Sequence, residues 1–275
     1  MCKHDIEDIQ IALLVEAIHK RYGYDFSNYA RASLKRRIRD FARTSNYEDI
    51  SAMIPTLLHD PSFGARLIFA LSVTVSEMFR DPEFFRFLRE QVIPYLKTYP
   101  FVRIWHAGCS TGEEVYSLAM VLQEEAFYHR ATIFATDLNE LALEKAREGI
   151  YPLERIKEYT TNYQRSGGTG SFTQYYRTGY DAAILDAGLK KNITFASHDL
   201  VTDGVFSEVH LILCRNVLIY FDKTLQDRVL RLFHESLTHG GVLALGSKES
   251  IRFAPVADFF KPLSDKWRIY QKTSP

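Results

Sequence analysis

The sequence predicts an α/β protein in which a Rossmann-like sheet follows an all-helical N-terminal domain and carries a small antiparallel β insert. The main observation is an apolar-rich run at 102–107, typical of a buried strand, followed by a glycine-bounded turn at 108–112 and by Val115, Leu118 and Leu122 at helical spacing. Strand, glycine turn and helix form the repeating unit of a doubly wound sheet. Two further observations agree with this class: helical periodicity before the first strand, and recurring strand-like runs after it.

Composition and charge are ordinary for a globular chain of 275 residues, a length that holds one large domain or two smaller ones. The net charge is zero, so overall charge does not attract the protein to nucleic acid. Cys2, Cys109 and Cys214 form neither a disulfide framework nor a zinc-binding pattern. The N-terminus begins no signal peptide, and no apolar run approaches the length of a membrane span. We therefore expect a cytoplasmic protein with no metal and no membrane insertion.

The first 80 residues are expected to form a helical domain with one strongly basic helix. A helical stripe from Ile6 to Ile18 is broken by a turn at 22–26, and a second helix is predicted over 28–43, followed by two short helices near Pro55 and Pro61. The second helix has one acidic residue, Asp40, against six basic residues: Arg31, Lys35, Arg36, Arg37, Arg39 and Arg43. Such a run is usually a solvated face, and the alternative is a surface that docks an acidic partner.

A linker helix is expected within 81–100. Asp81 is a suitable N-cap, Pro82 is a suitable first residue, and the helix is predicted to stop at Pro94. The residues just before it form a polar loop placed to fold over a ligand, with the alternative that Arg80 makes a salt bridge within the domain.

Acidic residues at two strand tips predict the kind of ligand. Glu113 and Glu114 end the glycine turn, where they would repel a pyrophosphate and attract a positive group. Asp137 ends the next strand-like run, at 132–136, where a carboxylate accepts the hydroxyls of a ribose. A nucleoside that carries a cation and no phosphate indicates S-adenosylmethionine.

Two alternatives are open for the same turn. Residues 108–112 also fit the G-x-S-x-G nucleophile elbow of an α/β-hydrolase. That fold places several strands before its elbow, however, and nothing later in the chain marks the partner acid and histidine. The second alternative is a tight turn that binds no ligand.

The rest of the chain is expected to complete the sheet and to interrupt it once. Further strands are predicted at 193–197, 209–214 and 242–245, helices at 139–149 and 225–237, and a final antiparallel hairpin from 259–260 and 267–270. The interruption is polar and contains a tyrosine-rich run at 172–185 that predicts a hairpin with a turn near 177–179. Its tyrosines either pack on one another or form a peptide-binding edge.

Four motifs together resemble the CheR-type chemotaxis receptor methyltransferases, and the resemblance covers nearly the whole chain. They are Ser76-Glu77-Met78-Phe79-Arg80, Cys109-Ser110-Thr111-Gly112-Glu113-Glu114 with Tyr116-Ser117, Thr136-Asp137, and Cys214-Arg215-Asn216-Val217-Leu218-Ile219-Tyr220-Phe221. The resemblance implies a class I methyltransferase sheet, with a helical domain at 1–80, a linker helix at 81–100, a methyltransferase domain at 101–275 and a β insert at about 165–192. It also implies transfer of a methyl group from S-adenosylmethionine to receptor glutamates, which leaves S-adenosylhomocysteine.

The resemblance also assigns site residues. Glu114 aligns best with the acid at the methionine end, next to Glu113, and Arg80 and Tyr220 would lie nearest the reacting centre. The full set of implied cofactor residues is Thr74, Ser76, Arg80, Glu113, Glu114, Asp137 for the ribose, Asp199 and Leu200 beside the adenine, and Arg215 and Asn216 on the methyl-donor side. Thr74 and Asp199 stand where asparagine is common in the family. The insert, which in some members binds a tether at the receptor C-terminus, is less family-like.

The chemistry agrees with these residues. A glutamate carboxylate is ionised at neutral pH, so its methylation needs neither a general base nor a metal. Tyr220 can stabilise the sulfonium through its ring face, and Arg80 can orient the incoming carboxylate. The six basic residues could then dock glutamate-rich helices of membrane chemoreceptors or related signalling proteins.

Other functions are open at this point. The chain could methylate nucleic acid or a small molecule, although Arg215-Asn216-Val217 replaces the loop expected for base N-methylation. It could also be a non-catalytic module that binds S-adenosylmethionine and signals to partners. We expect a bacterial chemotaxis enzyme that is a monomer and does not bind nucleic acid.

Overall fold

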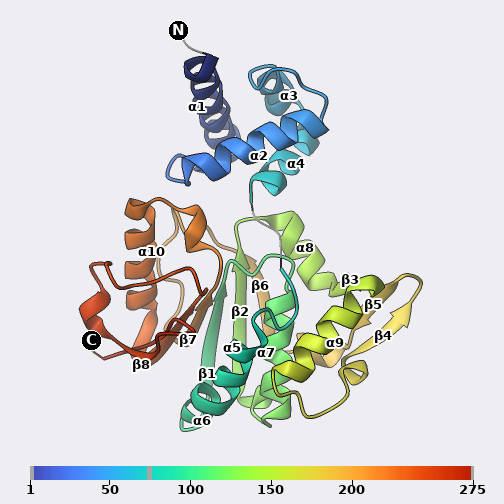
Figure 1. Cartoon of the computed structure of the whole chain (residues 1–275), viewed down its shortest axis with the longest axis vertical. Coiled ribbons are helices and arrows are strands. Elements are labelled where there is room, and N and C mark those ends of the chain that lie inside the picture. The colour runs from blue at the N-terminus through green and yellow to red at the C-terminus, as the bar shows by residue number, and fades with distance from the viewer. Residues whose placement is uncertain (1–2, 73–75, 274–275) are drawn as a thin grey trace.

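A computed structural model describes residues 3–72 and 76–273, and it places a helical domain above the carboxyl end of a mostly parallel sheet (Figure 1). The predicted α/β class, with its helical N-terminal domain and its small antiparallel sheet, is confirmed. The N-terminal domain consists of α1 (Lys3–Tyr22), α2 (Arg31–Thr44), α3 (Met53–His59) and α4 (Pro61–Leu71). Its buried apolar residues form a cluster of their own, separate from the two clusters on the sheet.

The linker helix runs further than predicted. It begins as α5 (Pro82–Phe87), passes through a π-helical stretch at Leu88–Val92, and continues as α6 (Ile93–Leu96). The expected stop at Pro94 is therefore wrong, because the π-helical stretch resets the hydrogen-bond register and leaves the proline in a first turn, where its missing N–H matters least. Asp81 precedes the helix in a left-handed conformation but does not cap it with its side chain.

The main sheet has seven strands in the order β6-β2-β1-β7-β8-β10-β9. The first five of these are parallel, and the last two form the predicted antiparallel edge hairpin. The strands are β1 (Val102–Ala107), β2 (Ala131–Asp137), β6 (Ile193–Ser197), β7 (Val209–Cys214), β8 (Leu237–Leu245), β9 (Phe260–Ser264) and β10 (Ile269–Lys272). The strand order reverses between β1 and β7, and open α/β sheets bind ligands at such a switch point.

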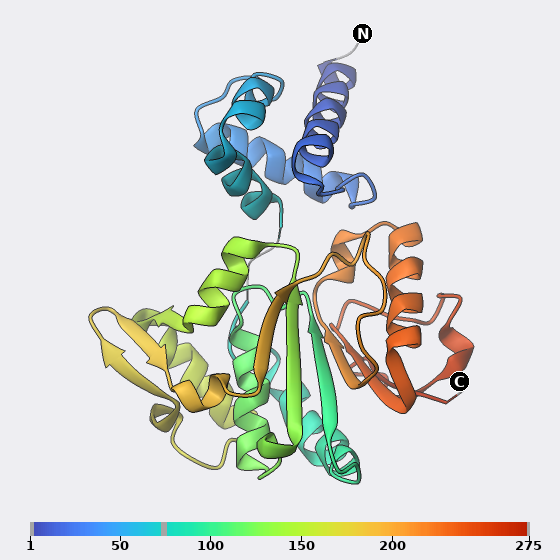
Figure 2. The same ribbon diagram turned by 180° about the vertical axis from the view of Figure 1, so that it is seen from behind.

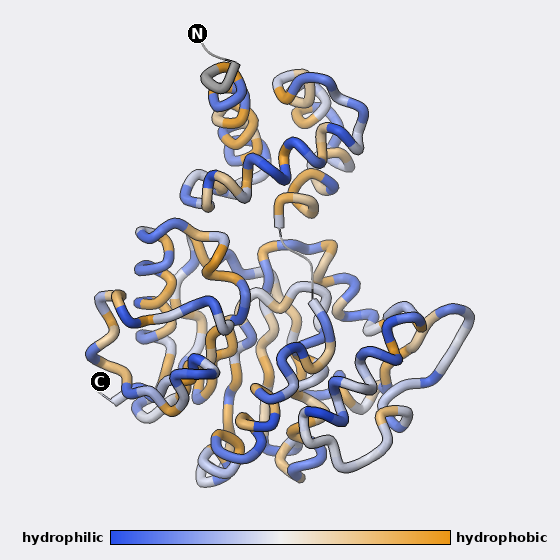
Figure 3. Tube along the Cα trace, in the orientation of Figure 1, coloured by the Kyte–Doolittle hydropathy of each residue, from blue (hydrophilic) through white to orange (hydrophobic). Residues whose placement is uncertain are grey.

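Helices cover both faces of the sheet because side chains alternate along each buried strand. Ile104 belongs to the core under the linker helix, α7 (Glu113–Glu124), α8 (Glu140–Glu148) and α9 (Ile156–Arg165), whereas its neighbour Trp105 belongs to the core under α10 (Lys223–Ser236). Figure 2 shows β6, β2 and β1 from behind, with α7 on their far side. Figure 3 shows the contrast between the apolar central strands and the hydrophilic α2. Short 3-10 helices lie at Tyr128–Arg130, Leu153–Arg155, Phe172–Tyr175, Ala187–Lys190, Leu218–Tyr220 and Ala257–Phe259.

The insert differs from the prediction in three details. Its sheet pairs β5 (Ala182–Leu185) with both β4 (Tyr176–Gly179) and β3 (Ile150–Pro152), so one strand lies well before the tyrosine-rich run. The turn falls at Tyr180, which has a positive φ of 46°, and not at 177–179, which is strand. Helix α9 was not predicted at all.

Candidate functional site

The glycine turn after β1 is held against the tip of β2 by backbone hydrogen bonds. The N–H groups of Gly108 and Cys109 both donate to the carbonyl of Thr136, at 2.8 and 2.9 Å. Gly108 has a φ of +74°, and a Cβ there would lie 2.5 Å from a methyl carbon of Val217, so the turn requires glycine for both conformation and space. The turn therefore approaches the loop after β7 closely, at the switch point of the sheet.

Asp137 is fixed at this edge by two N–H donors. Its carboxylate accepts from the backbone of Ser110 at 2.7 Å and of Asn139 at 2.9 Å. Burial raises the pKa of Asp137, and these two N–H groups act against that shift. A carboxylate oxygen has two lone pairs, so it can accept from a further donor such as a ribose hydroxyl.

Two neighbouring cavities lie along the tips of β1, β2 and β7, and they share Gly108, Asn216 and Val217. The first cavity brings together five predicted site residues, and its wall consists of Tyr29, Ser72, Gly108, Asp137, Leu138, His198, Asp199, Leu200, Asn216, Val217, Tyr220 and Phe221. The second brings together five, and its wall consists of Ser76, Arg80, His106, Gly108, Cys109, Ser110, Glu114, Arg215, Asn216 and Val217.

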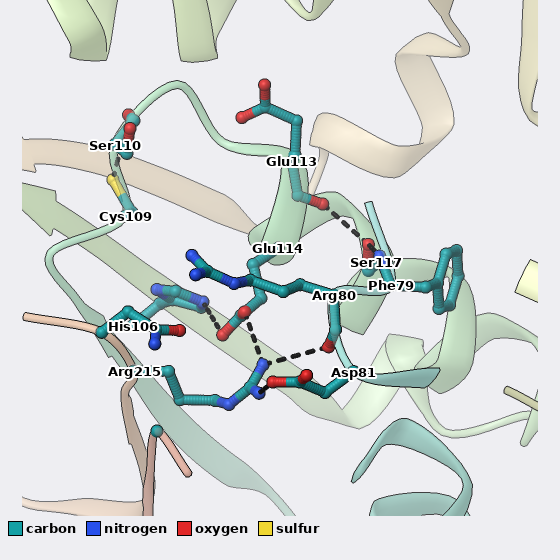
Figure 4. Close-up of polar contacts among 12 residues, drawn as sticks. Phe79, Arg80, Asp81, His106, Cys109, Ser110, Glu113, Glu114, Ser117 and Arg215 are labelled. Atoms are coloured by element: carbon teal, nitrogen blue, oxygen red, sulfur yellow. Dashed lines mark hydrogen bonds and ion pairs between the residues drawn. The ribbon is translucent and has the colours of Figure 1, made fainter. Parts of the chain in front are cut away.

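A buried ion-pair network forms the floor of the second cavity (Figure 4). The guanidinium of Arg215 donates to Glu114 at 2.7 Å and to Asp81 at 2.5 Å, and it lies 4.0 Å from the ring centroid of Phe84. Burial has the largest single effect and acts to raise the pKa of Glu114, but Arg215, His106 and Arg80 together outweigh it, so the pKa of this carboxyl is lowered. Glu114 is therefore an anion in a nearly dry place, suited to a ligand with a positive group.

Polar atoms of the second cavity fit a polar ligand. Five of its residues have buried side-chain nitrogen or oxygen atoms without a hydrogen-bond partner in the part of the chain that the structure describes: His106, Ser110, Glu114, Arg215 and Asn216. Buried polar atoms are normally paired, so their gathering in one cavity indicates a site that a ligand or water completes. The amino acid end of a ligand carries an ammonium group and a carboxylate group, and it would match these unpaired hydrogen-bond donors and acceptors. The residues of this site thus fit S-adenosylmethionine.

Backbone strain gathers around the same place. Phe79, Asp81, Ser110 and Asn216 all have a positive φ, between 52° and 62°, although none is glycine. Such conformations persist where the surroundings enforce them, and they cluster at functional sites. The loops after β1 and β7 and the loop before α5 are therefore held in unusual shapes around one cavity.

Some predicted residues lie elsewhere. Glu113 accepts from the Thr111 hydroxyl at 2.7 Å, and its carboxylate points away from Glu114 (Figure 4). Arg80 lines the second cavity and Tyr220 the first, so the two residues expected at the reacting centre lie on either side of the shared wall. The prediction for Thr74 falls outside the described residues.

The structure adds residues that sequence reasoning missed. His106 is a polar residue inside an apolar strand, which was a usable signal, and its Nε2 lies 3.3 Å from a Glu114 oxygen. Glu249 is 4% exposed and accepts four backbone N–H groups, those of Asn216, Val217, Ile219 and Gly246, at 2.6 to 3.3 Å. It thereby holds the loop after β7 in place, and no local sequence pattern predicts this role.

More of the basic side chains of helix α2 form ion pairs than its sequence suggested. Lys35 and Arg39 bind Glu7 of α1, and Arg31 binds Asp8, so α1 supplies acids that neutralise three of the six cations. The hydrogen bonds from Arg39 and Lys35 lower the pKa of Glu7 to about 2. Arg43 pairs with Asp40 on its own helix, whereas Arg36 is exposed.

Arg37 faces the methyltransferase domain. Its guanidinium lies 5.2 Å from the ring centroid of Tyr220 and donates to the carbonyl of Ser72 at 3.2 Å. Both of these partners line the first cavity. Arg37 therefore belongs to the contact between the two domains.

The described residues include no cluster of His, Cys, Asp and Glu suited to a metal ion. In the same parts of the chain, every helix is too short or too polar to cross a membrane.

Comparison with known proteins identifies the family. Residues 74–269 match the family model described as the SAM-binding domain of CheR methyltransferases, and residues 9–72 match the model of their all-alpha domain. The chain is 51% identical over 266 residues to a putative methyltransferase, Cher3, of Pseudomonas putida, with 97% of each chain covered. It is 33% identical to a chemotaxis protein methyltransferase of Listeria monocytogenes, covering 85% of this chain and 87% of that one, and 29% identical to that of Escherichia coli, covering 89% and 85%.

The matches span both domains, and the cavities at the switch point contain charged and polar groups that suit the cofactor. The chain therefore belongs to the CheR methyltransferase family and is a chemotaxis-type methyltransferase whose cofactor is S-adenosylmethionine.

Proposed function

We propose that the protein transfers a methyl group from S-adenosylmethionine to glutamate side chains of chemoreceptor-like signalling proteins, giving a glutamate methyl ester and S-adenosylhomocysteine. The observation that carries this proposal is the position of Arg80, a cation on the wall of the cavity that contains the buried anion Glu114. The same cavity thus contains an anion that suits a positive group and a cation that suits an incoming carboxylate. The names of the relatives, chemotaxis protein methyltransferases, support a receptor as the substrate.

Within this proposal, the first cavity holds the nucleoside end of the cofactor and the second holds the methionine end. Asp137 binds the ribose, while Asp199 and Leu200 lie beside the adenine. Glu114 and Asn216 bind the amino acid end, with Ser76 on the wall of the same cavity. Arg215 acts mainly by positioning Glu114, because its own guanidinium is buried in the ion-pair network.

S-adenosylmethionine supplies an activated methyl group on a positively charged sulfur. The acceptor oxygen of the glutamate forms a bond to the methyl carbon while the carbon–sulfur bond breaks and its electron pair stays on sulfur, so no proton moves. Arg80 orients the acceptor carboxylate, and the ring of Tyr220 favours the cation in a dry site. Positioning and exclusion of water then account for the rate enhancement.

Labelling with radioactive cofactor tests the reaction. We expect the protein to label receptor-containing membranes, and we expect base to release the label as volatile methanol, because carboxyl methyl esters hydrolyse in alkali. Receptors whose methylation-helix glutamates are replaced by alanine serve as the control. A label that survives base, or that appears equally on the control receptor, would contradict transfer to glutamate.

Arg36 is the strongest candidate for docking an acidic receptor helix, because it is exposed on α2 whereas Arg37 contacts Tyr220. We expect Arg36→Glu to raise the KM for the receptor about threefold to tenfold at low salt, and the effect to shrink as salt screens the charges. The affinity for S-adenosylhomocysteine, measured by calorimetry, should not change. Arg231→Glu makes the same charge change on α10 and should leave the KM unaltered.

A further inference from the structure

One segment of the N-terminal domain is bonded directly to the loop that follows β7. The N–H of Ala30 donates to the carbonyl of Tyr220 at 2.7 Å, and the N–H of Asp222 donates to the carbonyl of Asn28 at 2.9 Å. Between them, Tyr29 and Phe221 form an isolated antiparallel bridge. The backbone of Tyr29 is thereby fixed to the methyltransferase domain, although its chain position belongs to the helical one.

The Tyr29 side chain is also held at the boundary. Its ring packs edge-on against the ring of Phe26, which belongs to the core of the helical domain, with 4.9 Å between the ring centroids. It packs in the same way against Phe221, with 5.1 Å between the centroids. The residue lines the first cavity together with Asp137 and Asp199. Burial raises the pKa of Tyr29, and the negative charges of Asp199 and Asp137 raise it further. The phenol therefore keeps its proton at neutral pH and remains a hydrogen-bond donor.

We propose that Tyr29 is a cofactor-binding residue, which the N-terminal domain contributes across the domain boundary to the nucleoside end of the pocket. This inference rests on the proposed position of the nucleoside between Asp137 and Asp199. In that position the nucleoside has two acceptors for its own donors, and Tyr29 supplies a donor for one of its ring or ribose acceptors. Among the described residues of the N-terminal domain, Tyr29 is the only tyrosine that lines this cavity.

A consequence follows for the coupling between domains. If the cofactor contacts Tyr29, it binds more tightly to the form in which the helical domain is docked, and by linkage the cofactor strengthens that docking. The basic helix α2 begins at Arg31, two residues after Tyr29. The helix proposed to bind the receptor is thus continuous with a residue that contacts the cofactor.

Calorimetric titration with S-adenosylhomocysteine tests the proposal without any methyl acceptor. Tyr29→Phe keeps the ring contacts and removes the hydroxyl, and we expect it to weaken binding about threefold to tenfold, the value of one net hydrogen bond. The thermal unfolding of the free protein should stay unchanged. Tyr29→Ala, which also removes the wall of the cavity, should weaken binding further.

Two controls separate the possible causes. Tyr47→Phe removes a hydroxyl that binds Thr56 at 2.7 Å within the same domain; Tyr47 is not part of the wall of the first cavity, so its replacement should leave binding unchanged. Asp137→Ala tests the nucleoside position itself. Wild-type affinity in Tyr29→Phe, or an equal loss in Tyr47→Phe, would overturn the role of Tyr29 while the site assignment stands. Wild-type affinity in Asp137→Ala would overturn the site assignment and this inference with it.

Discussion

Replacement of Glu249 by alanine is expected to weaken the binding of S-adenosylhomocysteine about a hundredfold, although Glu249 touches neither cavity in the described structure. The carboxylate accepts four backbone N–H groups, and three of them belong to the loop that follows β7. A buried N–H left without a partner costs about 1–3 kcal/mol, so the loop is expected to rearrange and not to keep its shape. Asn216 would then leave its left-handed conformation, with a φ of 62°, and withdraw from both cavities.

Two further variants show whether the loss of affinity comes from the carboxylate of Glu249. Glu249→Gln keeps one acceptor oxygen and should lose only part of the affinity. The NH2 group that replaces the other oxygen cannot accept a hydrogen bond from the backbone N–H groups. Glu235→Ala removes an exposed carboxylate from α10 and should change neither affinity nor melting temperature. Calorimetry gives the affinity, and thermal unfolding gives the stability. Native affinity in Glu249→Ala would mean that the loop keeps its shape without the carboxylate.

The strands and the edge of the sheet that carries the candidate site could be predicted because their signals are local. The run from Val102 to Ala107, the glycine turn and the helix at Glu113 follow one another in the chain, and each has its own pattern. Asp137 and Asn216 could be placed because polar residues at the ends of parallel strands meet at one edge of the sheet. This is why most of the predicted cavity residues lie together.

The missed elements depended on contacts that are distant in the chain or on ambiguous residue types. Helix α9 buries Ile156, Tyr159 and Tyr163 at helical spacing, but the sequence around them is polar and its tyrosines also favour strands. The acid Glu7 reaches Lys35 and Arg39 only after α1 packs beside α2, so a count of charges on one helix overstated the free basic surface.

The roles of side chains within the site were the hardest to predict. Glu113 and Glu114 are neighbours in sequence, yet the helix directs one toward Thr111 and the other into the cavity. Asp81 was expected to cap a helix, and its carboxylate binds the guanidinium of Arg215 instead, which comes from a loop more than a hundred residues later in the chain. Sequence pattern fixes the position of a residue along an element more readily than its partner.

Replacement of Arg215 by methionine is expected to destabilise the folded protein by about 3–5 kcal/mol, measured by urea unfolding without cofactor, because it leaves the buried Glu114 without its main partner. The wild-type pKa of Glu114 lies below its ordinary value of 4.5, so its contribution to stability is present above that value and is lost as the pH falls through the lowered one. Without Arg215, burial dominates and the pKa of Glu114 rises above the ordinary value. Ionisation then costs stability as the pH increases.

The difference in stability between wild type and Arg215→Met should therefore be larger at about pH 7 than at about pH 5. The double variant with Glu114→Gln removes both partners of the pair, so it should recover part of the loss and make the difference less dependent on pH. Arg215→Lys keeps the charge but lacks the planar fork that binds Glu114 and Asp81 together, and an intermediate loss is expected. If the losses of the two single variants simply added in the double variant, Arg215 would stabilise the protein through its packing on Phe84 and not through the charge of Glu114.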